Sequence, residues 1–162
     1  MQYFKLVPQW LLLAAGMIFQ SFSYADQNSA LSVLNVYKTP TCGCCGKWLK
    51  HLADQNVSHK TFDLADLSAI KKRLNILPKY QSCHTGVSED GFVFEGHVPA
   101  KFIKQFLQAP VKGAIGLSVP AMPLGSPGME VGKRFHPYQV LLLKADGSHS
   151  VYAEVKRYEE QF

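Results

Sequence analysis

The hydrophobic and polar positions of this chain follow two periods, one typical of strands and one typical of helices. Residues 33–37 form a short run of β-prone side chains that ends at Thr39-Pro40, and residues 48–53 repeat apolar side chains at helical spacing. Residues 58–64 then alternate weakly between polar and apolar side chains. This part of the chain is therefore expected to form a strand, a helix and a second strand.

The middle of the chain continues with a helix, a hairpin and another helix. Asp66 can cap a helix whose apolar face ends before Pro78. Residues 85–97 are typical of two short strands joined by a turn at Glu89-Asp90-Gly91. Pro99 suits the start of a third helix with a compact apolar stripe. Up to this point the expected order is β-α-β-α-β-β-α.

The stretch of residues 110–137 is rich in glycine and proline, and we expect it to hold no long regular element. A connection of this length is usually functional or mobile. It carries Met122, Met129 and His136. After it, the chain closes with a second expected hairpin around Ala145-Asp146-Gly147.

The N-terminus is typical of a secretory signal peptide. A charged start precedes an apolar run at residues 10–19 and a small-residue cleavage site at Ser23-Tyr24-Ala25. The run is short for a membrane span, and an uncleaved anchor is the alternative. We therefore expect residues 1–25 to be removed, leaving residues 26–162 as a single domain in the periplasm, with no membrane attachment.

The mild positive charge of the chain does not indicate nucleic-acid binding. The formal net charge is +5, and it falls to +4 when residues 1–25 are removed. The basic residues are scattered apart from short groups such as Lys71-Lys72-Arg73, and they form no stripe interleaved with aromatic side chains.

Four cysteines carry the candidate chemistry. Cys42, Cys44 and Cys45 share one tetrapeptide between the first expected strand and helix, and Cys83 lies farther along the chain. A helix N-terminus stabilises thiolate over thiol, and thiolates there can exchange disulfides or bind a soft metal. Because exported thiols tend to form disulfides, structural bridges remain an alternative, as does simple packing.

The order of the elements, with a Cys-x-x-Cys pair between the first strand and the first helix, resembles the thioredoxin fold. The resemblance implies an α/β fold with a central mixed sheet and flanking helices, extended here by the C-terminal hairpin and the long Pro/Gly/Met loop. Thioredoxin-like proteins place a cis-proline beside their cysteines, whereas this chain has Ser82-Cys83-His84-Thr85 at the corresponding place. The resemblance therefore implies that Cys83 and His84 lie beside Cys42–Cys45.

The residue types favour copper over zinc. Thiolate and thioether sulfurs together favour Cu(I) over harder ions. Four cysteines could also form a tetrahedral zinc site, but structural zinc sites usually use two separated pairs. The adjacent Cys44 and Cys45 cannot easily both face one ion, and they suit several ions that share bridging thiolates. The sequence thus favours a small copper cluster.

Histidine and methionine side chains could complete such a site. His84 directly follows Cys83, whereas His97 could equally satisfy the end of a helix. Met122 and Met129 could bind the metal as thioethers, or they could pack within the loop or core. The histidines that we expect to be exposed and without a role are His51, His59 and His149.

Five motifs occur in the order seen in a known family. They are YKTPTCGCCGKW, SCHT, EGHVPA, VPAMPLGSPGME and PYQVLL. Through them, residues 33–155 resemble the periplasmic CopG-type copper-resistance proteins, long described as a domain of unknown function. The resemblance implies a thioredoxin-like domain that binds copper, is encoded near copper exporters and has been proposed to interconvert Cu(I) and Cu(II).

Carried over motif by motif, the resemblance also implies a metal site. Its residues are Cys42, Cys44, Cys45 and Cys83, with His84, His97, Met122 and Met129 as nearby candidates. Two positions depart from the family pattern. Ala121 stands where glycine is usual, and His136 stands where an acidic residue is common, so no role transfers to His136.

The sequence therefore favours an exported protein that serves copper tolerance by holding Cu(I) in a cysteine-thiolate cluster. Whether it is also an enzyme stays open at this point. A thiol–disulfide oxidoreductase that uses Cys42 and Cys45 is the main alternative, and a copper carrier without redox activity is the third. The partners implied are copper ions and either a copper export system or a redox partner in the cell envelope.

Overall fold

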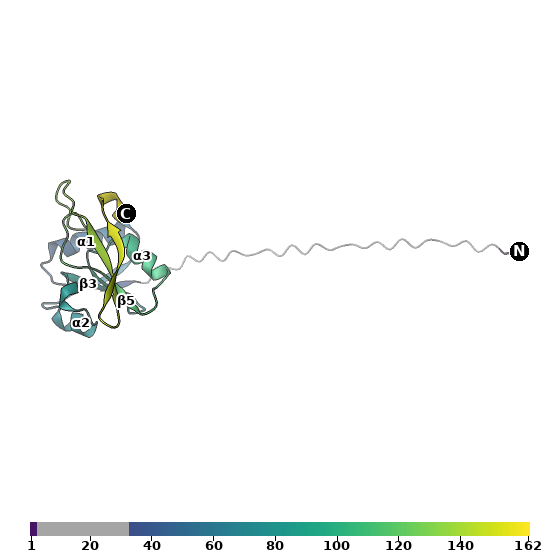
Figure 1. Ribbon diagram of the computed structural model, residues 1–162, viewed down its shortest axis with the longest axis horizontal. Helices are drawn as coiled ribbons and strands as arrows, with labels where there is room; N and C mark the ends of the chain where they lie inside the picture. Colours follow the sequence, from purple (N-terminus) through teal and green to yellow (C-terminus); the bar gives the residue numbers. More distant parts are fainter. Residues whose placement is uncertain (3–32) are drawn as a thin grey trace.

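A computed structural model of the protein describes residues 1–2 and 33–162, which form a mixed α/β fold around one seven-stranded sheet (Figure 1). The expected mixed α/β class is confirmed. Apart from its first two residues, the expected signal peptide of residues 1–25 lies outside the described part, so the peptide and the domain boundary that follows it stay predictions. Within the described ranges, no helix has the length and apolar character needed to cross a membrane.

The elements follow the expected order as far as the third helix, and a further strand comes after it. The strands are β1 (Leu34–Lys38), β2 (His59–Asp63), β3 (His84–Val87), β4 (Val93–Gly96), β5 (Ala114–Val119), β6 (Tyr138–Lys144) and β7 (His149–Val155). The helices are α1 (Gly43–Asp54), α2 (Ser68–Arg73) and α3 (Ala100–Gln108), with the short 3₁₀ helices η1 (Pro78–Tyr80) and η2 (Tyr158–Gln161).

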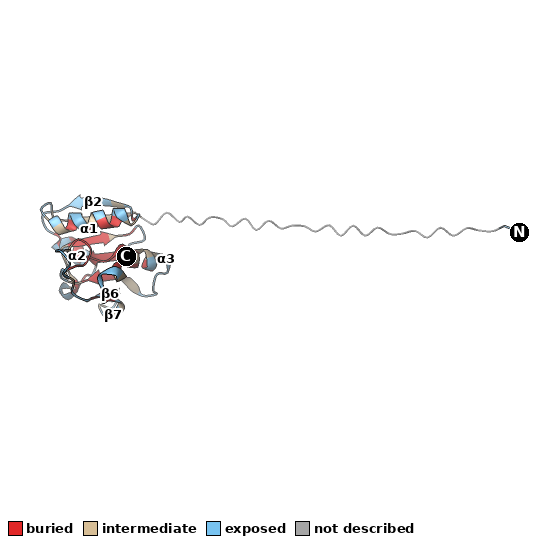
Figure 2. Ribbon diagram, turned by 90° about the horizontal axis from the view of Figure 1, so that it is seen from above, coloured by how far each residue is buried: buried red, intermediate tan, exposed pale blue. Residues whose placement is uncertain are grey.

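The sheet has the strand order β2-β1-β3-β4-β5-β6-β7. β1 pairs in parallel with β2, β4 pairs in parallel with β5, and the remaining neighbours are antiparallel. Figure 2 shows exposed residues along β2, at one edge of the sheet, and along the outward side of α1, whereas the central strands are buried. The parallel β1–β2 connection runs through α1, as parallel pairs require.

Two hydrophobic clusters cover opposite faces of this sheet. In β6, Val140 and Leu142 belong to the larger cluster, whereas Leu141 and Leu143 belong to the smaller one, as alternate positions of a strand should. The apolar faces of α1 and α3 pack in the larger cluster, and Tyr80 of η1 packs in the smaller one. Each fully buried side chain of this size contributes about 1.5–3 kcal/mol. The strand ends and the start of α1 are thereby held in place.

The expectation that residues 110–137 contain no long regular element is wrong for β5, which lies between β4 and β6. Gly116 explains the error. Its φ is +150°, and a Cβ at this position would lie 1.8 Å from the carbonyl oxygen of Val93. The glycine that suggested a loop is therefore what allows β5 to approach β4. Residues 120–137 remain largely irregular, as expected.

The expectation that His51 is exposed is also wrong. The side chain is 8% exposed, and its Nε2 accepts a hydrogen bond of 3.0 Å from the Ala100 N–H at the start of α3. His51 therefore satisfies the helix end that the sequence had offered to His97. Helical spacing places His51 three residues after buried Trp48, so the apolar stripe of α1 includes a polar member.

Candidate metal centre

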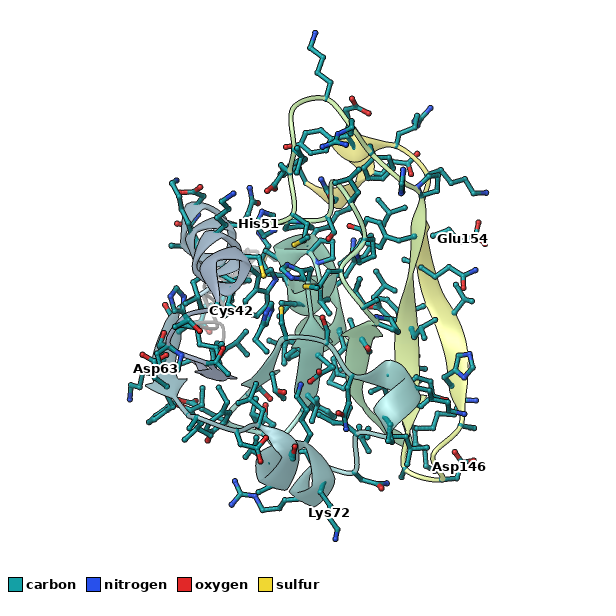
Figure 3. The ribbon with its side chains drawn as sticks, turned by 90° about the vertical axis from the view of Figure 1, so that its left-hand side faces the viewer. Cys42, His51, Asp63, Lys72, Asp146 and Glu154 are labelled. Atoms are coloured by element: carbon teal, nitrogen blue, oxygen red, sulfur yellow. A yellow bond between two sulfur atoms is a disulfide. The ribbon has the colours of Figure 1, made fainter. Side chains whose placement is uncertain are left out.

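The four cysteines meet where α1 begins and β3 begins. Cys42 caps α1, Cys44 and Cys45 lie in its first turn, and Cys83 immediately precedes β3. β1 and β3 are antiparallel, with Lys38 opposite His84, so the end of β1 and the start of β3 lie side by side. Sheet pairing therefore brings Cys83 to the helix N-terminus, and Figure 3 shows sulfur atoms gathered beside the start of α1.

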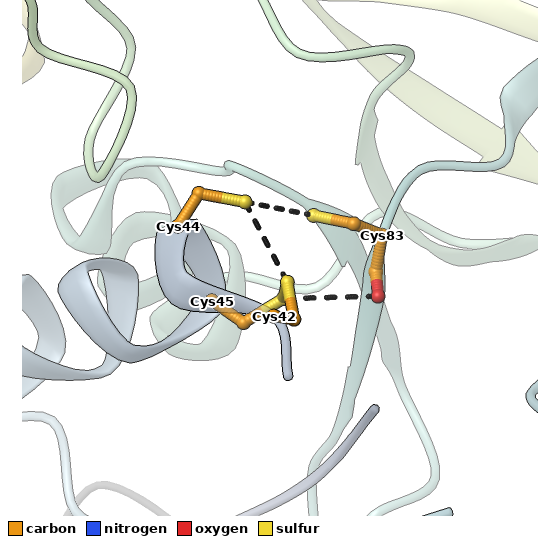
Figure 4. A group of neighbouring side chains, drawn as sticks. All are labelled: Cys42, Cys44, Cys45 and Cys83. Atoms are coloured by element: carbon orange, nitrogen blue, oxygen red, sulfur yellow. Dashed lines mark hydrogen bonds between the residues drawn. A yellow bond between two sulfur atoms is a disulfide. The ribbon is translucent and has the colours of Figure 1, made fainter. Parts of the chain in front are cut away.

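The sulfur atoms form one compact group (Figure 4). Cys44 Sγ lies 3.5 Å from Cys42 Sγ and 3.8 Å from Cys83 Sγ, and the four sulfurs all lie within 4.8 Å of one another. Cys42 and Cys45 are joined by a disulfide, whereas Cys44 and Cys83 are free thiols. Cys42 and Cys45 can therefore act as thiolate ligands only after a two-electron reduction.

Two imidazoles flank Cys83. Its Sγ lies 3.2 Å from His84 Nδ1 and 3.3 Å from His97 Nε2. The Nδ1 of His97 lies 2.8 Å from the carbonyl oxygen of Pro127, and because a carbonyl only accepts, this nitrogen carries the proton. The lone pair of His97 Nε2 then faces Cys83. The ring of His97 is oriented by this backbone hydrogen bond in the way that metal-binding histidines commonly are.

His84 is fully buried beside Cys83. Its ring packs against that of Trp48, with the centroids 4.2 Å apart, and its Nε2 has no hydrogen-bond partner in the described part of the chain. Burial lowers the pKa of His84 well below its ordinary value and also lowers the pKa of His97. Both rings are therefore neutral at neutral pH, which is the form that binds metals.

Burial raises the pKa of the Cys83 thiol to about 12, and the neighbouring thiol of Cys44 adds to the effect. In the absence of metal, Cys83 therefore stays protonated at neutral pH and is a poor nucleophile. A metal ion that binds Cys83 must release this proton, so its affinity should increase with pH.

The loop of residues 120–137 covers the start of α1. Gly128, with φ +91°, lies so close that a Cβ would be 2.7 Å from the carbonyl oxygen of Cys44. The carboxylate of Glu130 accepts the Gly128 N–H at 2.9 Å and braces this turn. On the other side, the Ser82 hydroxyl donates to the Ala121 carbonyl oxygen, which ties the beginning of the loop to the residue before Cys83.

The two candidate methionines occupy different positions in this loop. Met129 borders a hollow of about 300 Å³, whose lining residues are Gly43, Cys44, Lys47, Gly128, Met129, Glu130 and Val131. Met122 follows Ala121 and is 50% exposed. Of the two, Met129 is therefore the one that shares a surface with a cysteine.

Some contributions to the site have no signal in the sequence. The Pro127 carbonyl that orients His97 is a backbone group, and Gly128 is one of several glycines in its loop. Trp48, the first residue of the apolar repeat at residues 48–53, is buried and its ring packs against that of His84. Only the tertiary structure brings these groups to the cysteines.

Comparisons with known proteins point to copper. Residues 80–129, which include Cys83, His84, His97 and both loop methionines, match the family described as "Protein of unknown function, DUF411". The chain is similar to the solved structure named "Copper resistance protein copG- Form 1", with 41% identity and a TM-score of 0.72 over 78% of this chain and 98% of that one. It is similar to "Form 2" of the same protein with 42% identity and a TM-score of 0.72, over 77% and 98% of the two chains. A search of curated proteins gives no match.

Proposed function

Because the chain belongs to the family of the copper resistance protein CopG, we propose that it binds copper in the periplasm and serves copper tolerance. The observation that supports this best is the group of four sulfurs within 4.8 Å of one another, with two neutral imidazoles beside Cys83. Soft sulfur donors in this number favour Cu(I) over harder ions.

The proposed ligands fall into two groups that share Cys83. The sulfurs of Cys42, Cys44 and Cys45 come from the start of α1, where the helix dipole favours thiolates. On the other side of Cys83 lie the imidazoles of His84 and His97. Because Cys83 contacts both groups, its thiolate is suited to bridge two copper ions. A cluster of Cu(I) ions with bridging thiolates is therefore the form that we propose for the bound metal.

The binding site is tested by titrating Cu(I) into the fully reduced protein in competition with a chelator. We expect Cys83→Ser to lose stoichiometry and affinity, whereas Ser88→Ala, a control in the turn between β3 and β4, should bind as the wild type does. Wild-type stoichiometry and affinity in Cys83→Ser would place Cys83 outside the site.

The Cys42–Cys45 disulfide supports a redox step within the same proposal. Oxidation of this pair from dithiol to disulfide releases two electrons and two protons. The two electrons reduce two Cu(II) ions to two Cu(I) ions, which the thiolates of Cys44 and Cys83 can then bind together with the histidines. Returning the disulfide to the dithiol requires two electrons from a redox partner of the cell envelope.

This step has a stoichiometry that can be measured. Anaerobic addition of Cu(II) to the reduced protein, in the presence of a Cu(I)-specific chelator, should yield two Cu(I) ions for each disulfide formed. A Cys42→Ser/Cys45→Ser variant, which retains Cys44 and Cys83, should give much less Cu(I). Equal yields from both proteins would show that the Cys42–Cys45 pair is not the electron donor, and the absence of Cu(I) from both would leave the carrier alternative.

A thiol–disulfide oxidoreductase is the second candidate, and the disulfide at a helix N-terminus favours it. The raised pKa of Cys83 and the presence of two further thiols fit copper binding better. The two functions differ in what copper does. We expect copper to protect the cysteines of the reduced protein from iodoacetamide, with little turnover of insulin as a disulfide substrate. Rapid turnover that copper does not diminish would put the oxidoreductase first.

The proposed location depends on the N-terminal segment outside the described residues. Cell fractionation should recover the protein in the periplasm, and N-terminal sequencing should find Asp26 as the first residue. Recovery with the membrane and an intact N-terminus would show instead that residues 1–25 act as an anchor. In either location, the partner that we propose to receive the bound copper is a copper export system.

A further inference from the structure

One buried carboxylate holds both ends of the segment that carries Cys83 and His84. Glu95 Oε1 accepts the backbone N–H of Ser82 at 2.6 Å, and Glu95 Oε2 accepts the hydroxyl of Thr85 at 2.6 Å. The two residues between these anchors are Cys83 and His84. Glu95 therefore brackets the dipeptide that offers a sulfur and an imidazole to the candidate metal centre.

A buried lysine from α2 accompanies this carboxylate. Lys71 of α2 forms an ion pair with Glu95 and donates a hydrogen bond of 3.1 Å to the hydroxyl of Thr85. Lys71 is 4% exposed and Glu95 is fully buried, and theirs is the only ion pair with two buried members among the described residues. Apart from the ion pair itself, the side-chain hydrogen bonds of the two residues all lead to the segment that carries the candidate ligands.

Stability alone does not account for such a pair. The desolvation of two buried charges offsets much of their attraction, and apolar side chains of similar volume often stabilise a fold equally well or better. A buried charge pair does supply directional hydrogen bonds, which apolar side chains cannot. The arrangement of Glu95 therefore points to the geometry that it imposes on its neighbours.

The segment needs such an anchor because its own sequence does not restrict it. It contains no proline to fix a backbone dihedral angle, and its pairing with β1 begins only at His84. Glycine at position 96, with φ +72°, allows β4 to pass close to Ser82, where a Cβ would lie 2.6 Å from the Ser82 Cβ. This close approach lets the side chain of Glu95 reach the Ser82 N–H.

We propose that Glu95 is a positioning residue that, with Lys71 as its counter-ion, holds Cys83 and His84 in the orientation that binds copper. The proposal rests on the proposed copper site. Rotation of the dipeptide would change the distances of 3.2 Å and 3.3 Å that join Cys83 Sγ to the two imidazoles. Loss of a group that orients metal ligands typically lowers metal affinity about 10–100-fold.

The test compares three variants of the full chain. Glu95→Gln replaces the carboxylate by an amide of the same shape, and Thr85→Val removes one anchor while retaining the ion pair. The double variant Lys71→Met/Glu95→Gln removes both charges together. We expect Cu(I) affinity, measured by chelator competition, to fall about 10-fold or more in Glu95→Gln and in the double variant, and less in Thr85→Val. The thiolate-to-copper absorption bands should shift in all three.

Stability serves as the control. The double variant should recover thermal stability relative to Glu95→Gln, because it leaves no unpaired buried charge, yet its copper affinity should stay low. Ile103→Val, in the core contributed by α3, should lower stability without changing affinity or absorption. Copper affinity that returns together with stability in the double variant would overturn the proposal, as would unchanged affinity and absorption in Thr85→Val. If Glu95→Gln does not fold, Thr85→Val and the double variant decide alone.

A measurement without metal separates this proposal from the proposed function. In a Cys44→Ser background with the Cys42–Cys45 disulfide intact, Cys83 is the one remaining thiol of the chain. We expect Thr85→Val to change its iodoacetamide alkylation rate severalfold, whereas Ile103→Val should not. If the wild type binds no copper but the alkylation rate changes as expected, the proposed copper site is wrong, whereas the positioning of Cys83 by Glu95 and Thr85 is supported. If the wild type binds copper and the alkylation rate does not change, the positioning role of Glu95 is wrong.

Discussion

Two sets of buried histidines in this protein show what distinguishes a candidate metal ligand from a structural group. His51 is buried on α1 and accepts the Ala100 N–H, so its ring has a clear role in joining α1 to α3. His84 and His97 are equally buried, but their ring nitrogens face the Cys83 sulfur at 3.2 Å and 3.3 Å. Burial and a lowered pKa are common to all three rings.

The difference lies in what the nitrogens contact. The Nε2 of His51 is satisfied by the backbone, whereas the Nε2 of His84 has no partner in the described part of the chain. An unpaired buried nitrogen costs free energy unless another function compensates for it. Histidine burial is therefore no guide to metal binding by itself, whereas burial beside a sulfur is.

The largest expected effect comes from replacing a histidine beside Cys83. In His97→Gln, the amide can still donate to the Pro127 carbonyl, but the imidazole lone pair that faces Cys83 is lost. We expect Cu(I) affinity to fall about 10–100-fold, measured by chelator competition. His51→Leu is the matched control and should bind copper as the wild type does. Equal affinities in both variants would remove His97 from the site.

The sequence predicted the meeting of the cysteines correctly, because a strand followed by a helix places Cys42–Cys45 at a helix N-terminus. The partner segment at Cys83 followed from the resemblance to a known fold, and the pairing of β1 with β3 brings it there. The contributions of Glu95 and His51 could not be predicted. From a hydrophobic pattern, charged and polar residues are expected to be exposed. In the folded protein both are buried, because Glu95 accepts the Ser82 N–H and His51 accepts the Ala100 N–H, and both partners are distant in sequence.

Replacing His51 should affect the stability of the fold, whereas replacing His84 or His97 should affect copper binding. His51→Leu leaves the Ala100 N–H at the start of α3 without an acceptor, and we expect the metal-free protein to lose about 1–3 kcal/mol. Chemical denaturation monitored by tryptophan fluorescence measures this loss. An unchanged unfolding midpoint would show that the hydrogen bond between His51 and Ala100 contributes little.

Lowering the pH should reduce the stability of the protein through protonation of His51. Burial lowers the pKa of His51 below its ordinary value of 6.5, although the nearby carboxylates of Glu130 and Asp54 partly oppose this shift. The unfolded chain then binds a proton more readily than the folded one, so stability is retained above about pH 6.5 and lost as the pH falls below it. We expect the decline in His51→Leu to be shallower, by up to about 1.4 kcal/mol per pH unit. Parallel curves for the two metal-free proteins would contradict the shift.

The two methionines repeat the contrast on a smaller scale. Met129 shares a hollow with Cys44, whereas Met122 is half exposed. Replacement of either by leucine nearly conserves volume, so stability of the metal-free protein should change by less than about 1.5 kcal/mol. We expect Met129→Leu to lower copper affinity more than Met122→Leu does. The reverse order would show that the loop closes over the metal through Met122, and a large loss of stability would assign Met129 to packing.

The smallest effect concerns the backbone of the loop beside Ser82. Ala121 has φ +58°, a left-handed conformation that costs a residue with a Cβ about 1–2 kcal/mol. Glycine avoids this cost but loses about 0.5–1 kcal/mol through the greater freedom of the unfolded chain. Ala121→Gly should therefore stabilise the protein by up to about 1 kcal/mol. Asn56→Gly, at φ +59°, is the control and should gain less, because asparagine tolerates this conformation. Destabilisation by Ala121→Gly would mean that the left-handed backbone at this position carries no strain to relieve, and that the alanine is retained for its side chain.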